Sequence, residues 1–288
     1  LDDCIDNADN GLIYAYSFYL DNMAPHWDAL VLNDYDAVIP LVWKKKFSIK
    51  YCYQPPFTQQ LGLFGNIKDE ELKILFTKIT AIVKYGDWLF NHHNKFIGLF
   101  YPVIPMTNLV INLEDGYDNI HRRYKKDLLD NLKRAEKSGI SYEAGNDINK
   151  TVDLYRSHYA NRTAHVKNKD YKNFNSLCLQ AGQNNNCLIR EVKDNNGNLL
   201  ASALLLKDKR RIYNMMNTTT EEGRKKEANH FLLDHIIQEF SGQQFLFDFE
   251  GSDISSIKKF YEKFGAFDQP YYHWHYNDLP FYLKWIKK

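Results

Sequence analysis

The sequence predicts an α/β fold with mixed sheets, repeated in two domains. Two stretches carry the same pattern of an apolar strand, a basic turn and a return strand, at 36–53 and again at 198–216. An amphipathic helix and a short aromatic strand follow each hairpin, the strands lying at 88–90 and 245–247. Repetition of one supersecondary pattern indicates a duplication, and a cleft shared by two such domains is the expected place for a working site.

The first domain is predicted over residues 1–138. Asn10-Gly11 interrupts its first helix, and Pro55-Pro56 forbids a helix in the loop that follows the hairpin. A strongly charged connecting helix closes the domain and ends at Gly139. The other predicted elements are helices over 1–23 and 69–84, and strands over 27–32, 36–42, 49–53, 88–91 and 107–113; the connecting helix spans 117–138.

The second domain is predicted over residues 139–288. Asp147 is the expected N-cap of its first helix, and the Asn195-Asn196-Gly197 turn precedes the second hairpin. The predicted helices span 147–162, 170–181, 226–240, 254–263 and 279–287, and the strands span 140–144, 187–193, 198–206, 212–216, 244–249 and 271–276.

The composition excludes several classes of protein. The chain has 288 residues, of which 44% are hydrophobic and 25% charged, as in globular proteins. A net charge of +1 gives no global attraction to nucleic acid or to an anionic membrane, which disfavours tRNA as a partner. The sequence contains no run of about 18 apolar residues, so we expect no transmembrane helix. It also shows no recognisable signal peptide. The four cysteines lack CxxC spacing, so we expect reduced thiols and a cytoplasmic protein.

The histidines do not predict a metal site. His92 and His93 are adjacent, so on a strand their rings point to opposite faces. His273 and His275 share a strand face, but no cysteine or carboxylate lies in step with them along the sequence. We therefore expect no metal ion.

Four motifs make the chain similar to a known superfamily. Residues 257–267, IKKFYEKFGAF, resemble the ending motif of GNAT N-acyltransferases. Residues 51–62 (YCYQPPFTQQLG), 131–140 (NLKRAEKSGI) and 247–251 (FDFEG) resemble FemAB-like proteins. Those proteins carry two GNAT-like domains in tandem, in agreement with the repeat. The resemblance covers nearly the whole chain and implies a bacterial enzyme that transfers an acyl group.

Three residues are candidates for catalysis. By resemblance, Tyr261 holds the position of the GNAT tyrosine that protonates the leaving group; alternatively, it anchors its helix in the core. Asp248 and Glu250 alternate with phenylalanines, so both carboxylates are expected on one face of a strand, where a base could sit. The alternative is a solvated or capping pair at the strand end.

The expected acyl-donor loop departs from the superfamily pattern. GNAT enzymes that bind CoA have a loop of the form Gln/Arg-x-x-Gly-x-Gly/Ala, whose backbone N–H groups hold the pyrophosphate. The corresponding stretch here, 224–229, has no glycine, and Glu227 would repel a phosphate. This departure disfavours acyl-CoA and leaves aminoacyl-tRNA as the other donor; a solvated turn is the alternative to a donor site. The candidate cofactor-binding residues are Arg224, Lys225, Lys226 and Asn229.

Two further polar groups are candidates for substrate binding. Glutamines around the proline pair could donate hydrogen bonds to a peptide or sugar, or only satisfy the loop backbone. Basic residues of the connecting helix could contact a phosphate-bearing substrate or a tRNA end, or form an ordinary ion-paired helix. The candidates are Gln54, Gln59, Gln60, Arg122, Arg123, Lys125 and Lys126.

Two functions remain open at this point. The first is an N-acyltransferase that moves an acyl or aminoacyl group to a small-molecule or peptide amine in the cleft between the domains. The second is a catalytically silent scaffold of two GNAT-like domains that binds a peptide or glycan. DNA is not an expected partner.

Overall fold

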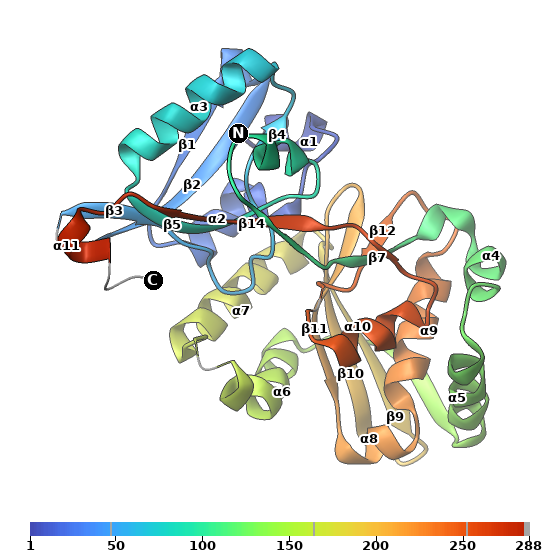
Figure 1. The fold of residues 1–288 in the computed structure, drawn as a ribbon. Coiled ribbons are helices and arrows are strands. Elements are labelled where there is room, and N and C mark those ends of the chain that lie inside the picture. Colours follow the sequence, from blue (N-terminus) through green and yellow to red (C-terminus); the bar gives the residue numbers. More distant parts are fainter. Residues whose placement is uncertain (47, 164, 252, 285–288) are drawn as a thin grey trace. The chain divides into compact units, whose positions relative to one another are not determined.

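The two predicted hairpins lie in separate sheets in the computed structural model, which describes residues 1–46, 48–163, 165–251 and 253–284. The chain divides into two units, which we call unit 1 (Leu1–Met106 with Pro270–Lys288) and unit 2 (Thr107–Gln269). Within the described residues, each unit holds one mixed seven-stranded sheet with helices packed on it (Figure 1). The predicted duplicated α/β fold is confirmed.

Unit 1 contains the first hairpin and the end of the chain. Its helices are α1 (Asp2–Asn7), α2 (Ser17–Met23), α3 (Asp69–Ile82) and α11 (Phe281–Lys284). Its strands are β1 (Trp27–Leu32), β2 (Ala37–Lys46), β3 (Ile49–Cys52), β4 (Phe64–Gly65), β5 (Tyr85–Phe90), β6 (Ile104–Met106) and β14 (Tyr271–Asn277).

The sheet of unit 1 has the order β1-β2-β3-β5-β14-β6, with β4 paired to β2. The pairing of β3 with β5 is parallel, and α3 forms the crossover between them. The apolar stripe predicted for this helix is buried against the sheet, where it meets Trp88 and Trp274. The stripe consists of Leu72, Leu75, Phe76, Ile79 and Val83.

Unit 2 contains the second hairpin and most of the charged helices. Its helices are α4 (Tyr117–His121), α5 (Lys126–Lys137), α6 (Ile148–Tyr159), α7 (Asn168–Gln183), α8 (Glu221–Lys225), α9 (Ala228–Phe240) and α10 (Ser255–Glu262). Its strands are β7 (Leu109–Asn112), β8 (Ile140–Gly145), β9 (Cys187–Asp194), β10 (Leu199–Lys207), β11 (Arg211–Thr219), β12 (Leu246–Asp248) and β13 (Phe267–Asp268).

The sheet of unit 2 has the order β13-β7-β12-β11-β10-β9-β8. The pair β11–β12 is parallel, and α9 forms the crossover between these strands. The apolar side of α9 packs on Ala201, Ala203 and Leu205 of β10, while α6 and α7 cover the opposite face of the sheet (Figure 1). This arrangement places the β11–β12 pair at the centre of unit 2.

The units group the chain differently from the predicted division at 138/139. Segment 107–138 lies in unit 2, because β7 pairs with β12 there. Segment 270–288 lies in unit 1, because β14 pairs with both β5 and β6. Strand pairing, which the sequence repeat does not encode, sets both assignments.

Three predicted helices differ from those observed. The helix predicted over 117–138 is two helices, because buried Tyr124 interrupts it and the amide of Lys125 donates to the carbonyl of Lys263 at 2.9 Å. The helix predicted over 226–240 begins only at Ala228. Of the helix predicted over 279–287, residues 285–287 lie outside the described residues. Among the described helices, none combines the length and apolar character needed to cross a bilayer.

Candidate active site

The central strands of unit 2 part from each other in mid-strand. β12 pairs with β11 only from Arg211 to Tyr213, and it ends at Asp248. β11 continues to Thr219, with a bulge in its pairing to β10 on the other side. Beyond Tyr213 and Asp248, the two strands are therefore no longer paired with each other. We treat the point where they separate as the candidate site.

Asn214 is the first residue of β11 beyond this point. Its side chain is buried, with 4% of the residue exposed, and within the described part of the chain neither amide atom has a hydrogen-bond partner. Asn214 lies opposite Leu205, so it faces the same side of the sheet as α9. Buried unpaired amides cost about 1–3 kcal/mol per group, and such a group commonly marks a functional position. The sequence analysis missed this residue.

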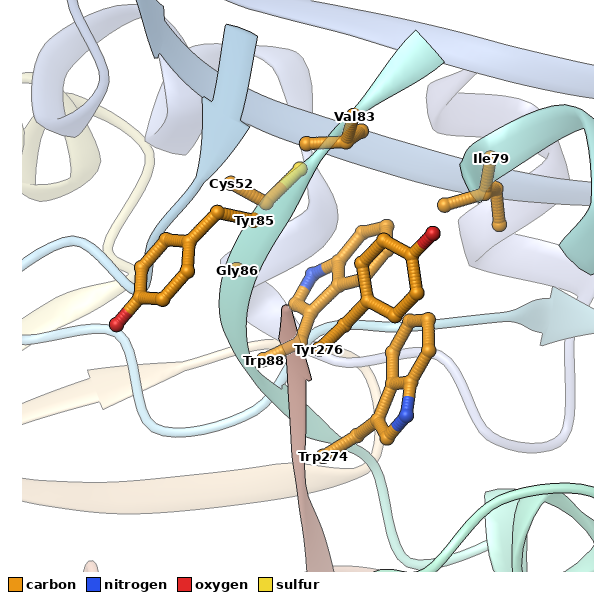
Figure 2. A pocket seen from close by; sticks show the side chains of 8 residues that line it. All are labelled: Cys52, Ile79, Val83, Tyr85, Gly86, Trp88, Trp274 and Tyr276. Atoms are coloured by element: carbon orange, nitrogen blue, oxygen red, sulfur yellow. The ribbon is translucent and has the colours of Figure 1, made fainter. Parts of the chain in front are cut away.

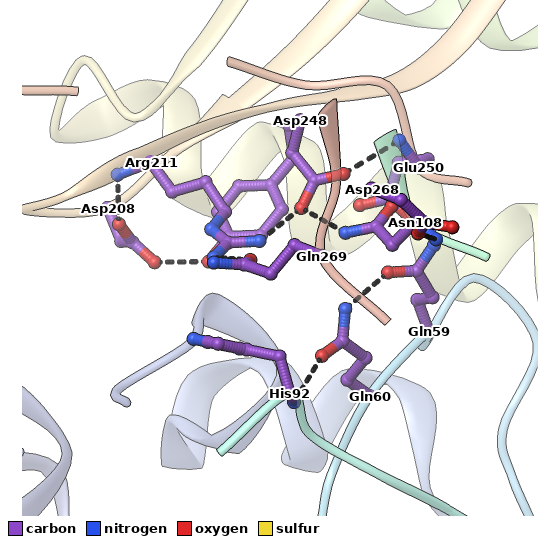
Figure 3. Close-up of polar contacts among 11 residues, drawn as sticks. Gln59, Gln60, His92, Asn108, Asp208, Arg211, Asp248, Glu250, Asp268 and Gln269 are labelled. Carbon is purple, nitrogen blue, oxygen red and sulfur yellow. Dashed lines mark hydrogen bonds and ion pairs between the residues drawn. The ribbon is translucent and has the colours of Figure 1, made fainter. Parts of the chain in front are cut away.

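Asp248 is fully buried at the end of β12. One carboxylate oxygen accepts hydrogen bonds from Arg211 and from Asn108 Nδ2, the latter at 3.0 Å, and the other accepts from the amide of Glu250 at 2.8 Å (Figure 3). The carboxylate thus has three donors, one of which, Arg211, also forms an ion pair with it. This geometry favours a positioning role for Asp248 over the predicted role of a base.

Glu250 does not share a strand face with Asp248 as the alternation predicted. β12 ends at Asp248, and Glu250 has a left-handed backbone with φ +64°. Gly251 is also left-handed, at φ +59°, so the chain turns sharply here. A non-glycine residue in this region costs about 1–2 kcal/mol, and such strain concentrates at functional positions. Glu250 therefore remains a candidate base, placed by a turn instead of a strand.

Tyr261 lies on α10 and stacks on Phe249, with ring centroids 4.3 Å apart. Burial raises the pKa of its hydroxyl above the usual value, and nearby Tyr155, Tyr159 and Glu250 raise it further. The phenol therefore stays protonated at neutral pH and acts as a donor. Glu250 is therefore close enough to Tyr261 for its carboxylate to affect the pKa of the phenol.

Two tyrosines of α6 are also close enough to affect the pKa of Tyr261. The rings of Tyr155 and Tyr159 are 4.9 Å apart, and burial raises the pKa of Tyr155 to about 12, with Tyr171, Tyr159 and Glu250 contributing. Helical spacing alone places both tyrosines on the apolar side of the helix predicted over 147–162. Their proximity to Tyr261 depends on tertiary packing, which no local spacing encodes.

The expected donor loop forms a short helix and a turn. The hydroxyl of Thr220 caps α8, and the amides of Arg224, Lys226 and Glu227 donate to carbonyls within the same turn. A Cβ on Gly223 would lie 2.1 Å from the carbonyl oxygen of Leu200, so this glycine serves packing against β10. These residues do not fit the glycine-type cradle of a CoA pyrophosphate, since the loop amides bond to the loop itself.

The side chains at the start of α9 also oppose an anion. Glu227, at φ +56°, pairs with Arg134 at 2.8 Å and with His230 Nδ1 at 3.0 Å. Asn229 follows in the first turn, and among the described groups its Oδ1 atom has no hydrogen-bond partner. Of the predicted loop residues, Arg224 and Lys225 are exposed, and Lys226 is half-buried.

The predicted basic residues lie on the α4–α5 connector and at the start of α5. All four are exposed. Arg122 donates to Asn119, Arg123 pairs with Asp115 at 2.6 Å and Lys125 with Glu262 at 3.9 Å; Lys126 begins α5. Two of the four residues, Arg123 and Lys125, therefore form surface ion pairs. All four side chains remain accessible to a polyanion because they are exposed.

The predicted glutamines lie in unit 1, and their observed contacts are with the protein itself. Gln54 Nε2 donates to the carbonyl of Thr58 at 2.9 Å. Gln60 is fully buried, donates to Gln59 at 2.6 Å and accepts from the amide of His92 at 3.1 Å (Figure 3). Gln54 thus bonds within its own loop, whereas Gln60 also joins the loop to the backbone of His92.

The described residues contain no group of three or more histidine, cysteine or acidic side chains that could hold a metal ion. The sequence analysis saw no carboxylate in step with His273 and His275, but Asp87 of the neighbouring strand β5 accepts from both, at 3.2 and 2.8 Å. A cavity in unit 1, between Cys52 and Trp88, holds only about 10 Å³ (Figure 2). That is scarcely room for one water molecule, so it is no ligand site.

Comparisons with known proteins agree with this architecture. Residues 122–254 match the family model of the acetyltransferase (GNAT) domain. Comparison with curated proteins gives no match.

Three solved structures are similar over nearly the whole chain. FemX has 12% sequence identity and a TM-score of 0.71, covering 100% of this chain and 97% of FemX. A conserved protein of unknown function from Bacteroides thetaiotaomicron has 11% identity and a TM-score of 0.65, covering 96% of each chain. The C-terminal domain of a protein from Agrobacterium fabrum, described as a lysylphosphatidylglycerol synthetase, has 12% identity and a TM-score of 0.55, covering 96% of this chain and 92% of that one. The chain therefore has the FemAB-like tandem GNAT fold, and the part of it that matches the GNAT acetyltransferase model holds Asn214, Asp248 and Glu250.

Proposed function

We propose that the protein is an N-acyltransferase that moves an aminoacyl group from an ester donor to an amine, at the point where β11 and β12 part. The observation that carries this proposal is the placement of Tyr261, a partly buried phenol that stacks on Phe249 and is close enough to Glu250 for the carboxylate to raise its pKa. The match of residues 122–254 to a GNAT acetyltransferase domain supports acyl transfer as the reaction class. The predicted location in a cleft between the domains stays a prediction.

The reaction needs a base, donors for an oxyanion and an acid. The amine attacks the ester carbonyl carbon, a C–N bond forms, and Glu250 takes the proton from nitrogen. Asn214 Nδ2 is a candidate donor to the carbonyl oxygen while it carries negative charge. The C–O bond then breaks, and Tyr261 gives its proton to the leaving oxygen. Transfer of the proton from Glu250 to the phenolate restores both groups.

The raised pKa of Tyr261 favours an ester donor over a thioester. A thiolate has a conjugate-acid pKa of about 8.5, so proton transfer to it from a phenol with a pKa above 10 is uphill. An alkoxide is more basic than a thiolate, so it depends more on a proton from an acid such as Tyr261 when it leaves. Aminoacyl-tRNA releases an alkoxide, whereas acyl-CoA releases a thiolate.

The turn at 224–227 and the exposed basic residues also favour aminoacyl-tRNA over acyl-CoA as the donor. The amides of Arg224, Lys226 and Glu227 bond within their own turn, which disfavours CoA. The exposed Lys126 on α5 and Arg224 and Lys225 on α8 are available to a nucleic-acid backbone. The near-neutral chain predicts a modest, strongly salt-dependent affinity for tRNA.

Transfer assays test the proposal directly. The purified protein is incubated with radiolabelled aminoacyl-tRNA or acetyl-CoA, and with lysine-containing peptides or a diamine as acceptors. We expect labelled amide product only from aminoacyl-tRNA, and a loss of about 100-fold or more in Tyr261→Phe. Tyr117→Phe is the matched control, because its hydroxyl contacts Asp234 at 2.9 Å, away from Tyr261.

Two results would contradict the proposal. Product from acetyl-CoA at a higher rate than from aminoacyl-tRNA would reverse the assignment of the donor. No product from any donor, together with acceptor binding that survives Tyr261→Phe, would favour the silent scaffold.

A further inference from the structure

A buried ion pair lies directly beside the candidate base. Arg211 and Asp248 pair with side-chain exposures of 4% and 1%. Although burial alone would lower the pKa of Arg211, Asp248 and then Tyr213 raise it, so the guanidinium stays charged. A buried pair of this kind becomes rigid when its remaining donors and acceptors are also satisfied.

Neighbouring groups satisfy both members of the pair. Asn108 donates to Asp248 at 3.0 Å, and Arg211 donates to Gln269 Oε1 at 2.7 Å (Figure 3). Asn108 lies at the start of unit 2 and Gln269 at its end, and the amide of Gln269 donates to the carbonyl of Asn108 at 2.7 Å. The pair thus ties the central strands β11 and β12 to both ends of the unit.

The second oxygen of Asp248 is directed at the backbone of Glu250. It accepts the Glu250 amide at 2.8 Å, two residues along the chain. Glu250 has φ +64°, a conformation that reverts to a commoner one unless its surroundings hold it. The bond from Asp248 is one contact that can do so.

We propose that Arg211 and Asp248 are positioning residues, which hold the Glu250 amide and thereby fix the backbone from which its carboxylate acts on the substrate. The role in catalysis rests on the proposed function, whereas the role in holding Glu250 does not. Arg211 fixes one oxygen of Asp248, which leaves the other oriented toward the Glu250 amide. Neither residue is expected to touch the substrate.

Hydrogen exchange at the Glu250 amide tests the holding role without any substrate. Asp248→Asn keeps the shape but replaces one acceptor with a donor, so either Arg211 or the Glu250 amide loses its partner. We expect the Glu250 amide to exchange about tenfold faster or more, with little change at buried Phe247. Arg211→Lys should act in the same direction, because lysine cannot fork to Asp248 and Gln269 together.

Asp208→Asn is the matched control. One oxygen of Asp208 accepts hydrogen bonds from the backbone amides of Arg210 and Arg211, at 2.9 and 2.8 Å. The other oxygen accepts from the Tyr213 hydroxyl, and in Asp208→Asn this hydroxyl can instead accept from the side-chain amide of the asparagine. The change is the same chemically and lies in the turn between β10 and β11 next to Arg211, but Asp208 does not contact the Glu250 amide. Exchange at Glu250 should therefore stay within about twofold of the wild type.

Transfer kinetics test the catalytic part of the role. In Arg211→Lys we expect kcat to fall about tenfold or more while KM changes less than about threefold, the pattern of a group that acts only in the transition state. Glu250→Gln should remove most of the remaining activity in both backgrounds. A fall in kcat that merely follows the fraction of folded protein would show a structural role only.

Exchange results separate this inference from the proposed function. Equal acceleration at Glu250 and Phe247 in both variants would overturn the positioning role, because it would report general loosening of unit 2. If Asp248→Asn does not fold, Arg211→Lys decides, and Asn108→Ala, which removes only a neutral donor to Asp248, is the milder variant with the same expected direction. Selective acceleration without any acyl transfer would overturn the proposed function and leave Arg211 and Asp248 as the holders of Glu250.

Discussion

The two units differ in one buried asparagine: Asn108 of unit 2 is bonded to Asp248, as the asparagines of unit 1 are bonded, but among the described residues Asn214 is not. In unit 1, Asn10, Asn91 and Asn94 are all buried and donate to one carbonyl, that of Leu63, at 2.8, 2.8 and 3.0 Å. In unit 2, Asn214 is equally buried, yet within the described residues neither of its amide atoms finds a partner. The two units share a pattern of strands and helices, but these polar interiors differ.

The unpaired amide of Asn214 supports the proposed site in unit 2. Buried amides that bond to the backbone hold a loop in place, as in unit 1 around Leu63. A buried amide without a partner costs folding free energy, which selection tolerates where a ligand supplies the missing bonds. Asn214 lies in the unit that also contains Glu250 and Tyr261, so we assign the site to unit 2.

The largest expected effect comes from the ion pair of unit 2. Arg211→Met leaves Asp248 buried and uncompensated, so the free energy of unfolding should fall by about 3–5 kcal/mol in urea titrations. The matched change Arg134→Met breaks a pair with Glu227 in which the arginine side chain is 60% exposed, and it should cost less than about 1 kcal/mol. Equal losses in the two variants would contradict the distinction between them.

The satisfied network of unit 1 predicts a smaller loss. Asn94 accepts the amide of Leu63 at 2.8 Å and donates to its carbonyl, so Asn94→Ala leaves a buried amide without a partner. We expect the free energy of unfolding to fall by about 2–3 kcal/mol, measured by urea denaturation. Asn149→Ala, at an exposed asparagine bonded to Asn175, should change it by less than about 0.5 kcal/mol.

Replacing Asn214 should not lower the free energy of unfolding, in contrast to replacing Asn94. This difference is the most direct test of the comparison between the two units. Asn214→Leu has a similar shape and removes two unpaired polar atoms, so stability should stay the same or rise by up to about 2 kcal/mol. In the transfer assay the same variant should lose activity. A destabilisation of more than about 1 kcal/mol would mean that Asn214 is a structural residue like Asn94.

The sequence was informative where the signal is local. The two hairpins, the stripe on α3 and the Asp147 cap of α6 were all predicted from spacing and residue type, and all are observed. The motif around Tyr261 was found because it is contiguous. Alternation placed Asp248 on its strand, but it could not foresee that β12 ends there.

The remaining features arise from contacts between distant segments. Asp87 accepts from His273 and His275, which are more than 180 residues away in the chain, so no spacing in the sequence indicated it. The roles of Arg211 and Asn214 depend on where β12 stops pairing with β11. Sequence patterns report periodicity along one segment, whereas these sites are set by strand order.

Asp87 of unit 1, which is bonded to His273 and His275, gives the smallest predicted effect on stability. It also provides a contrast to the buried Asp248. Asp87 has a 48% exposed side chain. Burial would raise its pKa, but hydrogen bonds from His275, His273 and Tyr85 outweigh this and lower it below the usual value. The resulting stabilisation is present above the unfolded-state pKa of about 3.9 and is lost as the pH falls through the lower, folded-state pKa.

Solvent screening limits this contribution to less than about 1 kcal/mol. Urea titrations of wild type and Asp87→Asn should therefore differ by that amount at pH 6, and the difference should shrink as the pH falls below about 3.9. Asp28→Asn, at an exposed aspartate of β1, provides the control for a general charge effect. A difference that persists unchanged to the lowest pH would mean that Asp87 acts through shape instead of charge. The half-exposed Asp87 would then stabilise the fold through its shape and not through its charge. The difference in exposure between Asp87 and Asp248 would then not explain why the two carboxylates contribute differently to stability.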